Sequence, residues 1–243
     1  PLYNKRNDEY GGGATSRAKF PARVLERVLD AVGRDLAVTC KLSVDEGVKG
    51  GATAKDAVEV ARALERSGAH LLVLSGGMNV ESPWAIFGSS LPPAAMETDQ
   101  NVLVKLGAKL MPLQSPTLPF RALYLREHSL QVRAAVKLPL AYLGGAKSLA
   151  GVEQAMADGF DCVAMGRALI HEPDLINQFR DGRSTVSGCT ACNQCVSSMY
   201  TAGGTYCVLR GPNDAALGRI QAGAGTADKV TLGKAVPNSF AFG

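Results

Sequence analysis

The sequence lacks the long apolar run that a membrane-spanning helix or a secretory signal requires. No window approaches the roughly 18 consecutive apolar residues of a membrane span. The opening residues, PLYNKRNDEYGGG, contain no apolar core that resembles a signal peptide. These absences predict a cytoplasmic protein that makes no membrane contact.

The chain also lacks a basic stripe of the kind that binds nucleic acid. Its 26 Lys and Arg residues are interleaved with 22 Asp and Glu residues and leave a net charge of only +4. That excess favours anionic small ligands weakly. We therefore expect a small-molecule substrate and no nucleic-acid partner, and the sequence leaves homo-oligomerisation open.

Histidine is scarce, and no recognisable general base follows any predicted strand. The three histidines lie at a strand start (His70), inside a long connection (His128) and at a helix start (His171). None of these positions favours direct chemistry over a structural role. The sequence therefore leaves the catalytic residues unknown.

What the chain does contain is one alternating pattern of apolar runs and helical stretches. With 243 residues and 46% hydrophobic content it can bury one substantial core. Near-continuous hydrophobicity is typical of strands covered on both faces, and helices between them indicate parallel connection. The four predicted strands are AVTCKLS (37–43), AHLLVLSGG (69–77), LPLAYLGG (138–145) and FDCVAMGR (160–167).

Helical periodicity and capping residues predict the elements between these strands. The first helix, within about 15–33, has apolar residues at a spacing of four and Gly33 as its stop. The second opens at Thr53, with Asp56 in the capping-box position. Two further helices are expected from Ser148 to Gly159 and from Pro173 to Gly182. Cys40 and Cys162 fall within strands and are expected to be core residues.

The order of elements predicts an α/β fold with about four parallel strands. An expanded crossover is expected between Pro83 and Ala135, with helical stretches at 102–110 and 122–136. We divide the chain into a partial barrel (1–185), a cysteine-rich segment (186–212) and a disordered tail (213–243). Four β/α units cannot close an eight-stranded barrel, and the chain opens at Pro1 in a polar loop, so we expect a fragment of a longer protein.

Glycines follow the last two predicted strands. Gly144 and Gly145 end one strand, and Gly166 with Arg167 ends the next. Glycine lets backbone N–H groups approach phosphate oxygens without a Cβ in the way, and arginine adds a two-pronged cationic donor. Glycine after a strand also serves simply to make a tight turn. Because two such sites occur at successive strand ends, the pattern favours a phosphate cradle.

Lys41 lies within the first predicted strand. Alternation places Val38, Cys40 and Leu42 on one face and Lys41 on the other. If the apolar face meets the helices, Lys41 points toward the barrel axis. The residue is then either a lysine that reaches solvent or a cation directed at a bound electron-rich ring.

Several stretches, in order and spanning nearly the whole chain to about Leu209, resemble the C-terminal half of the Old Yellow Enzyme family of FMN-dependent NADH:flavin oxidoreductases. They are NKRNDEYGGGATSRAKF, KLSVDEG with GGAT, LVLSGG, YLGG, VAMGRALIHEPDL and CTACNQC.

This resemblance implies the C-terminal half of a (β/α)8 TIM barrel that binds FMN. It implies hydride transfer from NAD(P)H through FMN to an activated alkene or a similar acceptor. Lys41 would lie near the flavin ring, and Gly144, Gly145, Gly166 and Arg167 would hold its phosphate. The family's catalytic acid and substrate-binding pair would lie before Pro1.

Four of the six cysteines lie within residues 189–207, separated by two, two and eleven residues. They are Cys189, Cys192, Cys195 and Cys207. In a cytosolic protein such spacing favours metal ligation over disulfides, and three ligands in one loop with a returning fourth is closer to an iron-sulfur pattern than to zinc. Reduced thiols that only pack a turn remain an alternative.

The branch of the family that includes 2,4-dienoyl-CoA reductase and trimethylamine dehydrogenase carries a four-cysteine iron-sulfur motif at this place, which implies a 4Fe-4S cluster. Two alternatives to the flavoenzyme stay open. One is a truncated, inactive fragment, and the other is a barrel enzyme that acts on a phosphorylated metabolite and carries a structural zinc site.

Overall fold

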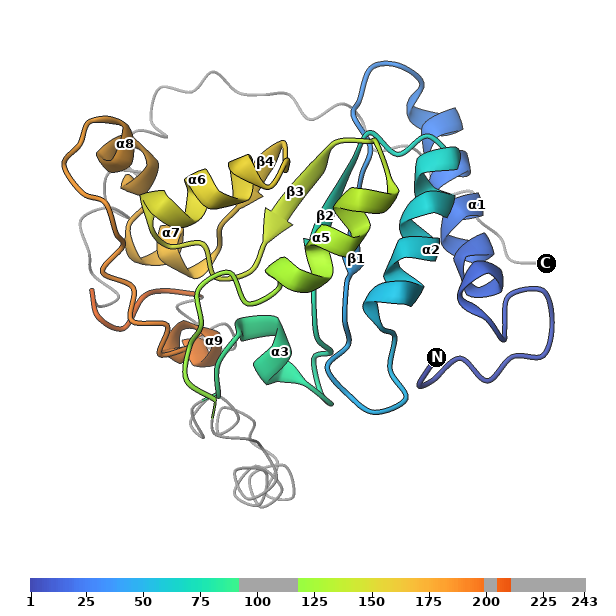
Figure 1. The fold of residues 1–243 in the computed structure, drawn as a ribbon, viewed down its shortest axis with the longest axis horizontal. Coiled ribbons are helices and arrows are strands. Elements are labelled where there is room, and N and C mark those ends of the chain that lie inside the picture. The colour runs from blue at the N-terminus through green and yellow to red at the C-terminus, as the bar shows by residue number, and fades with distance from the viewer. Residues whose placement is uncertain (92–117, 199–204, 211–243) are drawn as a thin grey trace, which may run out of the picture.

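The computed structural model describes residues 1–91, 118–198 and 205–210. Within these ranges, helices and strands alternate along the chain (Figure 1). The strands are β1 (Thr39–Ser43), β2 (Leu71–Ser75), β3 (Leu140–Leu143) and β4 (Cys162–Ala164). The helices are α1 (Ala14–Val32), α2 (Ala54–Arg66), α3 (Pro83–Phe87), α5 (Arg126–Ala135), α6 (Leu149–Ala157), α7 (Arg167–His171), α8 (Leu175–Arg180) and α9 (Gln194–Ser198).

The described strands form one parallel sheet in the order β1-β2-β3-β4. Strand order follows chain order, as expected when each β/α unit is added beside the last. The register places Lys41 beside Val73, Val73 beside Ala141, and Ala141 beside Cys162. The prediction of an α/β fold with four parallel strands is confirmed, and this progression is that of part of a β/α barrel.

The main hydrophobic core lies between the sheet and the helices. Leu72, Leu74, Leu140 and Tyr142 project from the central strands and are fully buried. Helices α1, α2 and α5 pack side by side along this face of the sheet (Figure 1). Burial of these apolar side chains stabilises the central strands against the helices.

The opposite face of the sheet is more open. Lys41 and Cys162 are exposed and Val73 is half-buried, whereas Leu42, the neighbour of Lys41, joins the core. The predicted alternation in β1 is therefore observed. The expectation for Cys162 as a core residue was wrong, because its side chain lies in the row of Lys41 on this open face, whereas Cys40 packs against the core.

Sequence signals for helix ends are confirmed at several positions. Thr53 and Asp56 form the expected capping box of α2, with a 2.9 Å bond from Thr53 N to Asp56 Oδ2. Gly33 ends α1 with a φ of 60°. Ser148 caps α6 by accepting a bond from Gly151 N at 3.1 Å.

The apolar stripe of α1 faces away from the described core. Its spacing-of-four residues Phe20, Val24 and Val28 are 62%, 46% and 39% exposed, and they line an open groove instead of meeting the core. The residues of α1 that do become buried are Ala18 and Leu25, which belong to the other side of the helix. The periodicity identified a helix correctly but did not identify the side that the described core covers.

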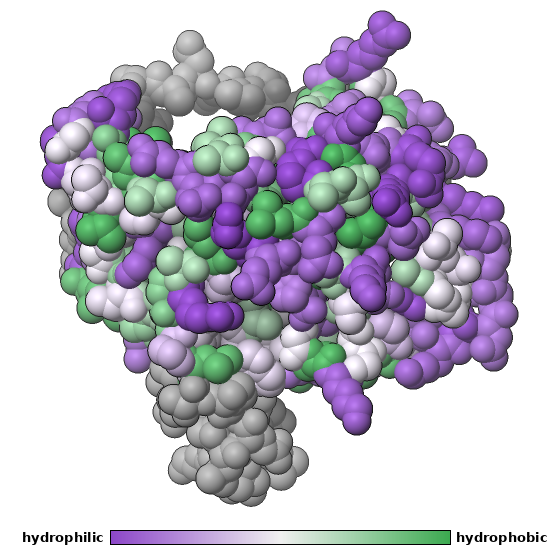
Figure 2. All heavy atoms as spheres, in the orientation of Figure 1, coloured by the Kyte–Doolittle hydropathy of each residue, from purple (hydrophilic) through white to green (hydrophobic). Residues whose placement is uncertain are grey.

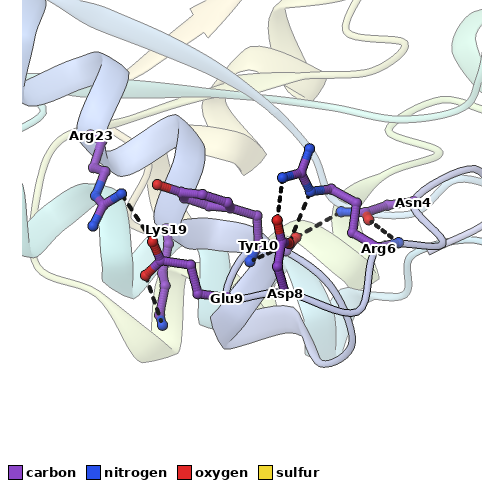
Figure 3. Close-up of polar contacts among 7 residues, drawn as sticks. All are labelled: Asn4, Arg6, Asp8, Glu9, Tyr10, Lys19 and Arg23. Carbon is purple, nitrogen blue, oxygen red and sulfur yellow. Dashed lines mark hydrogen bonds and ion pairs between the residues drawn. The ribbon is translucent and has the colours of Figure 1, made fainter.

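The loop before α1 is held by local polar contacts (Figure 3). Arg6 pairs with Asp8, while Glu9 pairs with Lys19 at 3.6 Å and with Arg23 at 3.2 Å. The ring of Tyr10 lies 5.4 Å from the guanidinium of Arg6 and 5.2 Å from that of Arg23. These residues are largely exposed, so each ion pair contributes little stability and the set serves mainly to shape the loop.

Two predicted segments fall partly or wholly outside the described residues. The helical stretch at 102–110 and the tail at 213–243 are not among them. The second stretch of the crossover, expected at 122–136, is α5. The last predicted helix is shorter than expected and is preceded by α7, which the sequence analysis did not predict.

Among the described helices, none is both long and apolar enough to cross a bilayer. Seen from the side of α5 and α6, the surface is mainly hydrophilic, with apolar atoms in small separate patches (Figure 2).

The core predicts a matched pair of leucine substitutions. Leu72→Ala, at 0% exposure, should lower the free energy of unfolding by about 2–5 kcal/mol, because it removes buried methyl groups and leaves a cavity. Leu36→Ala, at 62% exposure, should change it by less than about 0.5 kcal/mol. Urea unfolding of both variants checks this, and equal losses would contradict the assignment of the core.

Candidate functional site

A cavity of about 290 Å³ opens at the carboxyl ends of the strands. It is lined by all five residues predicted to bind a cofactor, namely Lys41, Gly144, Gly145, Gly166 and Arg167. They come from β1, from the loops that follow β3 and β4, and from the first residue of α7. The structure thus brings them together, while their roles in ligand binding stay predictions.

The loop after β3 presents unpaired backbone donors. In the described part of the chain, the N–H groups of Gly145, Ala146 and Lys147 donate to no acceptor. Gly145 has a φ of 80°, and a Cβ there would lie 2.9 Å from Tyr124 Cδ1. Glycine is therefore required by both conformation and space.

Tyr142 supports this loop from inside the core. Its hydroxyl donates to the carbonyl oxygen of Gly144 at 2.8 Å, and its side chain is fully buried. Burial raises the pKa of Tyr142, which keeps the hydroxyl protonated and able to donate. The glycine loop is thereby tied to the strand that precedes it.

The loop after β4 offers a second set of donors. The N–H groups of Gly166 and Arg167 also find no acceptor among the residues that the structure describes. A Cβ added to Gly166 would meet no heavy atom within 4 Å. Space alone therefore does not require glycine at position 166.

Arg167 is already partly engaged by the protein. Its guanidinium donates to Asn193 Oδ1 and, at 2.7 Å, to the carbonyl oxygen of Phe87, whose ring lies 5.5 Å away. Neighbouring Tyr124 donates to the carbonyl oxygen of Ile86 at 2.5 Å, and burial raises its pKa against the opposing effect of Arg167. Arg167 thus links the cavity to α3 and to the cysteine segment as well as offering charge.

Lys147 is a third cation of the cavity, one that was not predicted from the sequence. Its Nζ donates to the carbonyl oxygen of Cys189 at 2.9 Å and lies 5.2 Å from the centre of the Phe120 ring. The available signal was its position two residues after Gly145. With Lys41 and Arg167 it gives three cations among the described lining residues, which include no carboxylate. The resulting field favours an anionic ligand.

The predicted metal ligands are not gathered into one centre. Cys189 and Cys195 line the cavity and Cys192 is exposed, while Cys207 Sγ lies 3.1 Å from His171 Nδ1. Burial raises the pKa of the Cys195 thiol, and Cys189 and Cys192 add to the rise.

In the described ranges no group of three Cys, His, Asp or Glu side chains is arranged to hold a metal ion. The described residues thus show no preformed iron-sulfur or zinc centre. Metal binding by the four cysteines therefore stays a prediction from the sequence.

The cysteine segment docks onto the cavity loops. Ser187 N donates to Lys147 O at 2.8 Å, and Thr185, just before the segment, accepts a bond from Leu149 N at 2.8 Å. Asn193, between Cys192 and Cys195, is 1% exposed and holds Arg167. Its contact with Arg167 was not predicted from the sequence, because only the cysteines of this motif suggest a function.

Part of the chain matches a known family, and the chain is similar to several named proteins. Residues 1–83 match the sequence model of the NADH:flavin oxidoreductase / NADH oxidase family. The chain is 37% identical over 213 residues to 4,4'-dithiodibutanoate disulfide reductase of Rhodococcus erythropolis, a match that covers 86% of this chain and 52% of that protein. It is 29% identical over 195 residues to NADH oxidase of Thermoanaerobacter brockii. That match covers 79% of this chain and 26% of the oxidase.

A solved structure shares the fold. The complex of 2-naphthoyl-CoA reductase with 2-naphthoyl-CoA matches with a TM-score of 0.60 at 21% identity, over 88% of this chain and 28% of that one. The chain spans about half the length of its Rhodococcus relative and about a quarter of the NADH oxidase. Together these matches confirm the resemblance to the Old Yellow Enzyme family.

Two glycines of the cavity should respond differently to an added methyl group. Gly145→Ala should lower the free energy of unfolding by about 1–3 kcal/mol, because alanine is strained at positive φ. Gly166→Ala should cost less than about 1 kcal/mol, because its Cβ meets open space. Urea unfolding measures both, and an equal loss would show that the loop after β3 has no special requirement for glycine.

Proposed function

We propose that this chain is part of an FMN-dependent oxidoreductase of the NADH:flavin oxidoreductase / NADH oxidase family, and that its cavity holds the cofactor's phosphate end. The observation that carries the proposal is the convergence of two glycine loops with unpaired N–H groups on a cavity lined by three cations and no carboxylate in the described chain. The match of residues 1–83 to the family supports a flavin as the ligand.

The residues of the cavity fit the chemical groups of FMN. Backbone N–H groups of Gly145 and Gly166, with the guanidinium of Arg167, offer the donors that a phosphate dianion requires. Lys41 lies on the open face of β1 and makes no ion pair with the described residues, so its charge is available to an electron-rich ring. Tyr124 and Phe87, both half-buried, lie beside Arg167 at the cavity.

Bound FMN would supply hydride transfer from NAD(P)H to an acceptor. We assign the acceptor to activated alkenes or similar small molecules, and the disulfide named in the Rhodococcus relative is a second acceptor class to assay. In this scheme Lys41 stabilises negative charge on the reduced cofactor, while the glycine loops and Arg167 provide binding. No step is assigned to the cysteines.

Arg167→Ala should weaken FMN binding in the protein that contains this chain. Removing a charge-assisted phosphate contact should cost roughly 1.5–3 kcal/mol, or about 10- to 150-fold in Kd. Riboflavin, which lacks the phosphate, should bind with little change. Fluorescence titration with both flavins gives the answer.

Arg62→Ala is the matched control for this experiment, because Arg62 lies on α2 in an exposed ion pair with Glu59. Equal loss of FMN and riboflavin affinity in Arg167→Ala would argue against a phosphate contact. A protein that binds neither flavin but binds phosphorylated metabolites would favour the alternative barrel enzyme.

Lys41→Met should lower the reduction potential of bound FMN, because it removes a positive charge that favours the reduced, more negative cofactor. The affinity difference between FMN and riboflavin should be preserved, since Lys41 is assigned to the ring and not to the phosphate. A spectroscopic redox titration measures the potential. An unchanged potential would place Lys41 outside the range of the ring.

A further inference from the structure

Asn193 is the point at which three separate segments of the chain meet. Its side chain is 1% exposed. The amide Nδ2 donates to Ser89 Oγ and to Ser90 O, both at 2.9 Å, and Oδ1 accepts from the guanidinium of Arg167. Both amide donors and the acceptor oxygen are thus used inside the protein.

The backbone at Asn193 directs this side chain inward. Its φ is 60°, in the left-handed region that asparagine tolerates better than most residues. Its carbonyl oxygen accepts a bond from Val196 N at 3.0 Å at the start of α9. The turn between Cys192 and Gln194 therefore orients the amide toward Arg167.

Arg167 is consequently held from two sides before any ligand binds. Asn193 Oδ1 and Phe87 O each accept one of its N–H groups. A mobile arginine side chain loses rotamer entropy when a ligand fixes it. Because Arg167 is already fixed in the folded protein, ligand binding does not incur that entropy cost again. Because Arg167 has five N–H donors, these two contacts leave others for a ligand.

We propose that Asn193 is a positioning residue for the phosphate site, holding the guanidinium of Arg167 at the cavity and so coupling the cysteine segment to phosphate binding. This inference rests on the proposed function, in which Arg167 contacts the phosphate. The coupling is reciprocal, so a bound phosphate also stabilises the cysteine segment. If Asn193 instead held Arg167 away from the ligand, removal of the Asn193 amide would strengthen FMN binding.

Asn193→Gly is the direct test, because glycine accepts the left-handed backbone and loses only the amide. We expect FMN binding to weaken by about five- to tenfold, and riboflavin binding to change by less than about twofold. In the Arg167→Ala background, Asn193→Gly should add little further loss of FMN affinity. Fluorescence titration of the purified protein with each flavin measures all four affinities.

Two further variants complete the test. Asn4→Gly is the matched control, since Asn4 also bonds a backbone carbonyl, that of Tyr10, and does not line the cavity. If Asn193→Gly does not fold, Ser89→Ala removes one acceptor of the Asn193 amide without altering the turn, and FMN affinity should fall by about twofold with riboflavin unchanged.

The outcomes separate the two proposals. If Arg167→Ala weakens FMN binding while Asn193→Gly leaves it unchanged or strengthens it, Asn193 does not position Arg167 and the phosphate assignment stands. An additive loss in the double variant, or an equal loss for riboflavin, also overturns the role of Asn193. If the unaltered protein binds FMN no better than riboflavin, the proposed function itself fails, and the role of Asn193 fails with it.

Discussion

The parallel alignment of β1 to β4 constrains the rest of this molecule. It places the carboxyl end of every strand at one edge of the sheet, so residues far apart in the chain line one cavity. The core supports this alignment from the helical side, where Leu72 and Leu140 are fully buried. Tyr142 then joins core and cavity, because it is buried with them and bonds the glycine loop.

Charge at the cavity follows from that geometry. Lys41, Lys147 and Arg167 come from three different places in the chain, yet line one space without a carboxylate among the described lining residues. Two of these cations also hold the cysteine segment, Lys147 through Cys189 O and Arg167 through Asn193. The proposed anion site and the docking of this segment therefore use the same side chains.

Local sequence patterns predicted the helices and strands well, but predicted less well which residues pack against each of them. The apolar runs, the Thr53 capping box and the stop at Gly33 depend on neighbours in the chain, and each appears as expected. For α1, the periodicity indicates a helix but does not indicate whether another element covers its apolar face. Phe20, on that face, is 62% exposed.

The candidate site shows the same division. Strand-end glycines and Arg167 were recognisable because parallel strands bring their ends together, whereas Asn193 contacts Ser89 from 104 positions away, a pairing that no local pattern encodes. The cysteine spacing predicts a metal centre, and the described structure, in which Cys207 lies beside His171, does not show one.

The surroundings of Asn193 also limit how this position can change over evolution. A left-handed backbone disfavours branched side chains, the absence of solvent disfavours charge, and three hydrogen-bonding partners disfavour an apolar replacement. A lineage that altered this asparagine would leave polar groups on Ser89, Ser90 and Arg167 without their partner. Restoring these hydrogen bonds would require further substitutions at Ser89, Ser90 or Arg167. Asn193 should therefore be replaced rarely, and together with these partners.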